Sequence, residues 1–208
     1  MNMQAQTITT DPMQLGSPEE LKRRLSFIKE SDTSRGLLFN AVLEIVRKRK
    51  GEAAVLHCLE AAGEKKFVDF FSYPLSTFVT LLYAAARLLS TETGDFDGAL
   101  RQLGDQSATN FLSSASGKMM MSLVQQNPQR LFNSLRACLQ VVASSADQVS
   151  TRMTGPASGI ITYKHDLLPR PHLEGGVLAV FRAANVRSVK VRSWGTGPVD
   201  NEYEISWE

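Results

Sequence analysis

The sequence contains few of the residues from which most catalytic and metal-binding sites are built. Its 208 residues include only two cysteines, Cys58 and Cys138, and three histidines. Two cysteines cannot form a disulfide-rich scaffold, so we expect reduced, buried thiols in a cytoplasmic protein. The formal net charge is only +2, too small for bulk charge to attract a nucleic acid. Basic residues are in excess between 151 and 192, which we interpret as a solvated strand face. Nucleic acid is therefore not an expected partner.

Apolar segments long enough to cross a membrane are also missing from the sequence. The longest apolar stretch, residues 78–89, is interrupted by Thr80 and Arg87, whereas a spanning helix needs about 20 consecutive apolar residues. Residues 1–16 are polar and do not resemble a secretory signal. We expect residues 1–16 to be a flexible tail and residues 17–208 to form a single domain.

Motifs that bind phosphate are incomplete. Gly117-Lys118 resembles the end of a phosphate-binding loop, but the glycine required five residues earlier is replaced by Leu112. The residue after the lysine is Met119, whereas such a loop needs a serine or threonine there to reach magnesium. We therefore expect no nucleotide site of this type.

The three histidines are scattered. His57 lies beside Cys58 in a predicted helix, where neighbouring side chains point in different directions and form a poor metal pair. His165 and His172 flank a proline-rich segment, with Asp166 next to the first. Because zinc normally takes three or four protein ligands, we expect no metal site, and we predict no catalytic residue. An enzyme remains an alternative only if His165, Asp166 and His172 converge.

Apolar residues at three- and four-residue spacing predict a series of helices between residues 17 and 145. Ser17 before Pro18 is typical of a helix start, and Gly51 and Gly63 are typical of helix ends. The expected helices begin at residue 17 and after residue 34, and then cover residues 52–62, 75–90, 96–103, 105–115, 117–126 and 128–143.

The period of the pattern changes from 3.6 to 2 after residue 145, which predicts strands. We expect a strand–strand–helix–strand–strand order over residues 146–208, with the helix beginning at Gly176 and the third strand at Val186. In the last strand, Tyr203, Ile205 and Trp207 alternate with polar residues. The fold class is therefore α+β, with an N-terminal helical layer (17–145) packed on a small, mostly antiparallel C-terminal sheet (146–208).

Aromatic and methionine side chains are expected near the seam between the helices and the sheet. Binding pockets for small molecules are mostly apolar with a few polar anchors, so this set predicts a ligand site. The alternative is that the same side chains only fill the core. The candidate ligand-binding residues are Phe70, Phe71, Tyr73, Phe111, Met120, Phe132 and Tyr163.

Several segments resemble a known family. The matching strings are residues 32–44, 58–74, 111–118, 128–131, 174–178 and 202–207. They resemble a paralogous family of myxobacterial proteins of unknown function. More distantly, the layout is similar to the superfamily that contains haem-nitric-oxide-binding, four-vinyl-reductase-like and TRAPP-like proteins. That resemblance implies N-terminal helices, a sheet with a crossover helix and, in some members, a ligand between the two layers.

The resemblance also implies where haem would be ligated. Haem-binding members carry an axial histidine on the helix that corresponds to residues 118–123, and this sequence has methionines and no histidine there. The Tyr-x-Ser-x-Arg motif that holds the haem propionates is absent as well. We therefore expect no haem and no other cofactor.

Together these observations favour a non-enzymatic sensory or adaptor domain that binds a small apolar ligand or a partner protein between the helices and the sheet. A purely structural homodimeric module is the alternative, because TRAPP-like relatives dimerise through helices and the apolar helix 75–90 is a candidate contact.

Overall fold

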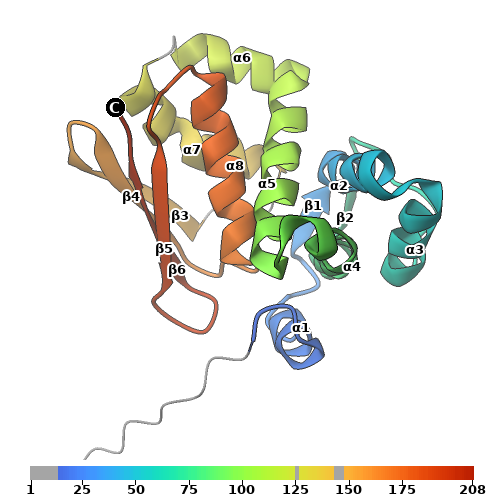
Figure 1. The fold of residues 1–208 in the computed structure, drawn as a ribbon. Helices are drawn as coiled ribbons and strands as arrows, with labels where there is room; N and C mark the ends of the chain where they lie inside the picture. The colour runs from blue at the N-terminus through green and yellow to red at the C-terminus, as the bar shows by residue number, and fades with distance from the viewer. Residues whose placement is uncertain (1–13, 125–126, 143–147) are drawn as a thin grey trace, which may run out of the picture.

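A computed structural model of the chain describes residues 14–124, 127–142 and 148–208. Within these ranges the chain begins with a mainly helical part (Figure 1). The elements of this part are α1 (Pro18–Leu25), β1 (Thr33–Arg35), α2 (Gly36–Lys50), α3 (Glu52–Ala62), β2 (Ser72–Pro74), α4 (Leu75–Thr93), α5 (Phe96–Ser113), α6 (Ala115–Val124) and α7 (Pro128–Val142). Residues 1–13 of the expected tail lie outside the described residues, whereas Leu15 packs against the helical core.

The C-terminal part is a four-stranded antiparallel sheet with one crossing helix. Its elements are β3 (Val149–Gly155), β4 (Ser158–Tyr163), α8 (Arg170–Ala183), β5 (Lys190–Gly195) and β6 (Asn201–Ser206). The strand order is β3-β4-β6-β5, and every neighbouring pair is antiparallel. The predicted α+β class and the strand–strand–helix–strand–strand order are confirmed.

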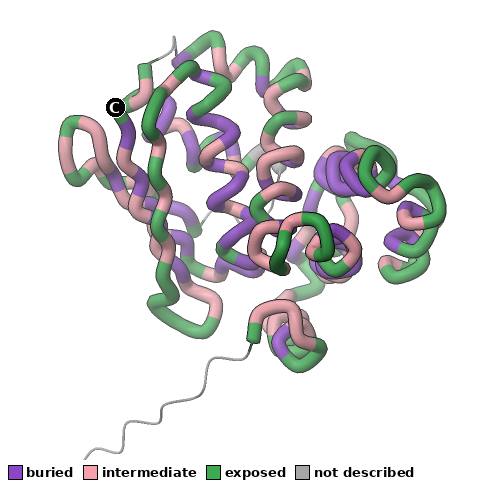
Figure 2. Tube along the Cα trace, in the orientation of Figure 1, coloured by how far each residue is buried: buried purple, intermediate pink, exposed green. Residues whose placement is uncertain are grey.

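Two hydrophobic clusters form the interior. The first is built from α2, α3, α4 and the beginning of α5. The second is built from α7, α8 and the inward face of the sheet, where Tyr203 and Ile205 are fully buried as their alternation predicts. Figure 2 shows the buried positions concentrated on α2, α4, α8 and the strands. The helix α5 contributes to both clusters, so it connects the two halves of the interior.

The start of the helical part is fixed by a buried polar network. The Ser17 hydroxyl accepts a hydrogen bond from the backbone N–H of Glu20, as the predicted cap requires. The Glu20 carboxylate binds Arg24 at 2.7 Å and accepts a hydrogen bond from the Tyr83 hydroxyl at 2.6 Å. Because these groups are mostly buried and satisfy one another, they attach α1 to α4 with a defined orientation.

Two predicted helix boundaries are wrong. The sequence predicts separate helices at 96–103 and 105–115, but α5 is continuous through Gly104. The sequence also predicts a helix start at Gly176, whereas α8 begins at Arg170. Pro169 is the N-cap and Pro171 lies in the first turn, where a proline removes no N–H that the helix needs.

The third strand of the sheet also starts later than predicted. It begins at Lys190 rather than at Val186. Asn185 and Ser188 both have positive φ angles, 58° and 52°, which place them in the left-handed region. Extended pairing therefore cannot begin until the chain has passed this turn.

The helices α5 and α8 lie side by side and approach so closely that no side chain separates their backbones (Figure 1). A Cβ atom on Gly104 would lie 1.8 Å from the carbonyl oxygen of His172, and one on Gly175 would lie 1.9 Å from that of Arg101. Glycine is thus required at both points of contact. Beside them, Glu174 accepts hydrogen bonds from Arg101 of α5 and Ser193 of β5, which links both helices to the sheet.

Among the described residues, none of the helices combines the length and the apolar character that crossing a membrane would require.

The adjacent glycines Gly175 and Gly176 provide a matched test of the contact between α5 and α8. Gly175→Ala would force α5 and α8 apart, and we expect it to lower the free energy of unfolding by about 1–3 kcal/mol. In Gly176→Ala, the added Cβ atom lies 3.6 Å from its nearest neighbour, the carbonyl oxygen of Gly104. It should be neutral or stabilising by up to about 1 kcal/mol, because alanine favours the helix. Urea denaturation of the two variants measures both values, and equal effects would contradict the close contact.

Candidate functional site

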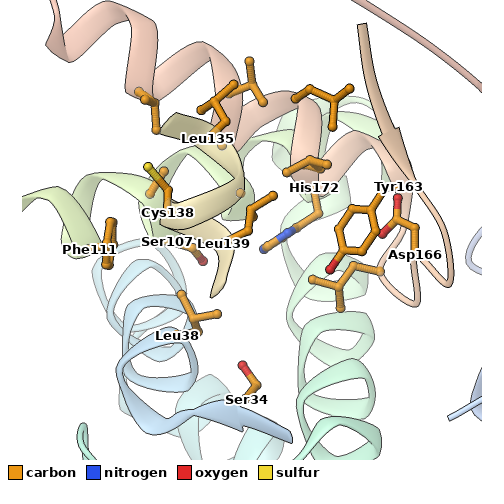
Figure 3. A pocket seen from close by; sticks show the side chains of 18 of the residues that line it. Ser34, Leu38, Ser107, Phe111, Leu135, Cys138, Leu139, Tyr163, Asp166 and His172 are labelled. Carbon is orange, nitrogen blue, oxygen red and sulfur yellow. The ribbon is translucent and has the colours of Figure 1, made fainter. Parts of the chain in front are cut away.

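A cavity of about 110 Å³ lies where the two hydrophobic clusters meet. Leu38 and Leu167 of the helical cluster line one side, and Leu135 and Val177 of the sheet cluster line the other. Figure 3 shows these surroundings, with side chains from α2, α5, α7 and α8 and from the segment after β4 directed at a common space. The position agrees with the seam at which the sequence predicts a ligand site.

The lining is mostly aliphatic, with a small number of polar side chains. Most of its members are leucine, valine, isoleucine, alanine or glycine. The polar or polarisable members are Ser34, Ser107, Cys138, Tyr163, Asp166 and His172. An apolar wall with few polar groups is the usual composition of a pocket that binds a small organic molecule.

His172 is the most unusual residue of the lining. It lies in the first turn of α8, directly after Pro171, and its ring meets the ring of Phe78 edge-on at 6.0 Å between centroids. Its Nε2 atom is buried without a hydrogen-bond partner in the described part of the chain. Burial lowers the pKa of the imidazole to about 4, so the ring is neutral near pH 7. Figure 3 shows the ring nitrogens directed into the cavity.

Ser107 approaches the cavity from α5. It is 3% exposed, and its Oγ atom is the other buried side-chain polar atom that lacks a partner among the described residues. Because Ser107 follows Gly104 by three residues, both lie on the same face of α5. Gly104 packs on the backbone of His172, so the glycine contact brings the serine and the histidine to the same space.

Asp166 is buried in the lining of the cavity, and residues of β6 hold its carboxylate. Its Oδ2 atom accepts hydrogen bonds from Asn201 Nδ2 at 2.9 Å and from the Tyr203 hydroxyl at 2.5 Å. Its backbone N–H donates to the carbonyl oxygen of Val199. Burial raises the pKa of the carboxyl above its usual value despite these bonds. Asp166 therefore holds the segment after β4 against β6 rather than offering a free acid.

The three residues of the enzyme alternative are not brought together. His165 does not line the cavity: its Nε2 atom lies 3.3 Å from Asp32 Oδ2, and its backbone N–H donates to Asp200. Asp166 and His172 do line it. In the described ranges, no group of three or more histidine, cysteine or acidic side chains is placed to hold a metal ion.

Of the seven side chains predicted to bind a ligand, Phe111 and Tyr163 line the cavity. Phe132 is buried in the sheet cluster, where its ring lies 5.7 Å from that of Trp207. Met120 is half-buried on α6 and does not reach the cavity lining.

The remaining three predicted residues lie on or before β2, away from the cavity lining. Tyr73 packs on Phe39, and its hydroxyl accepts a hydrogen bond from the backbone N–H of Val68. Phe70 and Phe71 are exposed, by 86% and 63%. Aromatic content identified two of the lining residues, but it did not identify Ser107, whose only sequence signal is its spacing from Gly104.

A family model described as "Protein of unknown function (DUF2378)" matches residues 28–208. The chain belongs to the DUF2378 family. The expectation of a family without an assigned activity is thereby confirmed. No curated protein matches the chain in sequence.

The fold of this DUF2378 protein is similar to that of H-NOX (haem-nitric-oxide-binding) proteins. An H-NOX protein from S. oneidensis in the Fe(II)NO state matches with a TM-score of 0.67 and 11% identity, over 84% of this chain and 99% of that one. The Fe(II)CO form of the Shewanella oneidensis SO2144 H-NOX domain gives 0.64 and 13%, over 84% and 98%. The unliganded Fe(II) protein from K. algicida gives 0.59 and 13%, over 84% and 96%. At these identities the likeness concerns the fold alone.

The neutral, buried His172 makes stability depend on pH. Its pKa is about 6.5 when unfolded and about 4 when folded, so the unfolded chain binds more protons between these values. Its contribution to stability is complete above pH 6.5 and is lost as pH falls towards 4. Between pH 7 and pH 5 we expect the free energy of unfolding of the wild-type protein to fall by about 2 kcal/mol more than that of His172→Leu.

Urea denaturation at the two pH values measures this difference. His57→Leu makes the same substitution at an exposed position of α3 and serves as the control. A wild-type pH dependence that is unchanged in His172→Leu would show that the imidazole is not buried in its neutral form.

Proposed function

We propose that the protein is a non-enzymatic sensory or adaptor domain that holds a small, mostly apolar molecule in the cavity between its helices and its sheet. The observation that carries this proposal is the position of the cavity, whose walls come from both hydrophobic clusters. A molecule bound there contacts both halves of the interior at once. Binding therefore stabilises one relative arrangement of the two halves, which is what a sensor needs.

The volume limits the size of the ligand. An engineered apolar cavity of about 150 Å³ stays dry and binds benzene or xenon. The cavity of this protein is somewhat smaller, at about 110 Å³. A molecule of roughly six to eight non-hydrogen atoms is therefore the appropriate class, with small adjustments of the aliphatic lining.

The similarity to H-NOX proteins suggests haem as a ligand, but haem does not fit the residues of this cavity. The cavity is smaller than the ~300–1,000 Å³ of ordinary ligand pockets, and a porphyrin needs more space than benzene. The helix α6 carries no histidine, and Met119 on it is 67% exposed. His172 of α8 is the imidazole on the cavity lining, but the cavity of about 110 Å³ is smaller than the engineered one that binds benzene.

Benzene is a suitable probe for the proposed cavity. We expect a saturating concentration to raise the melting temperature of the purified protein, because only the folded chain binds it. Ala108 lines the cavity, so Ala108→Leu fills part of its volume and should abolish this increase. Ala137→Leu makes the same substitution at an exposed position of α7 and should leave the increase intact. If neither benzene nor phenol produced an increase in the wild-type protein, the cavity would not be a binding site.

A homodimeric interaction module is the second candidate, but the helix first associated with it is already covered. Phe78, Leu81 and Leu82 of α4 are fully buried within the chain. The observation that favours a second copy is instead the exposed apolar segment before β2, in which Phe70 is 86% and Phe71 63% exposed. Exposed aromatic side chains are enriched in protein interfaces.

Light scattering over a range of concentrations tests this second candidate. A dimer that dissociates in Phe70→Ser/Phe71→Ser, without a change in the far-UV circular dichroism, would support an interface at this segment. A wild-type protein that stays monomeric at every concentration would refute it.

A further inference from the structure

The cavity contains two polar atoms that have no partner in an otherwise aliphatic space. They are Nε2 of His172 and Oγ of Ser107, from α8 and α5, and they are the buried side-chain polar atoms without partners in the described ranges. Both residues line the same cavity, and Figure 3 shows their side chains directed into it. Buried polar groups are nearly always hydrogen-bonded, so two orphans in one cavity indicate a missing partner.

We propose that the ligand of this cavity is a small uncharged molecule with one hydroxyl group, of the size of phenol, and that His172 and Ser107 bind this hydroxyl. This inference rests on the proposed function, because it specifies which molecules the same cavity selects.

A hydroxyl group suits this pair of side chains. The neutral imidazole either donates or accepts at Nε2, depending on its tautomer, and the serine hydroxyl can do either. A hydroxyl on the ligand donates one hydrogen bond and accepts another, so it satisfies both atoms in either tautomer. A purely apolar molecule such as benzene would leave both atoms unpaired.

A charged ligand is disfavoured by the same lining. No lysine or arginine is among the described residues that surround the cavity, so an anion would be buried without a counterion. Asp166 is the acidic residue of the lining, and its Oδ2 atom is already bound by Asn201 and Tyr203. A cation would therefore have to compete with two existing hydrogen bonds. The aliphatic walls bind the apolar body of the ligand instead.

The inference is tested by calorimetric titration of the full-length protein with phenol and with benzene at neutral pH. We expect phenol to bind roughly fivefold more tightly or better, since one net hydrogen bond changes affinity by about that factor. The dissociation constant of benzene divided by that of phenol should fall in Ser107→Ala and in His172→Leu. In the double variant this ratio should reach about one. Benzene binding in each variant shows that the cavity and the fold persist.

Tyr163→Phe tests the competing assignment, because Tyr163 also brings a hydroxyl group to the lining. The preference for phenol should survive this substitution, and Ser107→Thr should retain it as well because the hydroxyl is kept. A preference that disappears in Tyr163→Phe and persists in the double variant would overturn the assignment to His172 and Ser107.

The wild-type titrations distinguish a failure of the hydroxyl specificity from a failure of the proposed function. If benzene binds and phenol binds no more tightly, the orphan atoms are hydrated and the hydroxyl specificity is wrong, while the cavity function stands. If neither probe binds, both the specificity and the proposed function are wrong.

Discussion

The structure depends on the contact between the backbones of α5 and α8. Gly104 and Gly175 allow the two helices to approach to a distance at which any side chain would clash with a carbonyl oxygen. The helix α5 packs in both hydrophobic clusters, while α8 belongs to the sheet cluster. Their contact therefore determines how the helical half of the interior sits on the sheet half. Hydrogen bonds from Arg101 and Ser193 to Glu174 add a polar link across the same junction.

The cavity borders this contact. Gly104 of α5 and His172 and Gly176 of α8 belong to its lining, and its volume is about 110 Å³. The same contact places His172 opposite Ser107, so the remaining space carries polar groups in a defined position. A fold similar to that of H-NOX proteins thus contains a small, mostly aliphatic cavity. The fold alone does not assign a ligand.

The sequence predicted features that depend on local periodicity and missed those that depend on a distant partner. The alternation around Tyr203 predicted a half-buried strand correctly, because the period of a strand is a local property. The sequence places Gly104 between two predicted helices, because its role in α5 depends on a backbone almost 70 residues later in the chain. The predicted helix begins at Gly176, after His172, so the position of His172 in the cavity is not predicted. Phe70 belongs to the predicted site because composition does not distinguish an exposed aromatic residue from a buried one.

A small, mostly apolar space lies between the two halves of the interior, and we propose that it accepts a ligand. Xenon is the most direct probe, because it binds apolar cavities of this size and is easily located by X-ray diffraction. A crystal of the protein pressurised with xenon should show a bound atom between Leu38, Leu135 and Val177, close to His172. A crystal structure in which these side chains touch and xenon is absent from the junction of α5 and α8 would show that the protein has no such binding space.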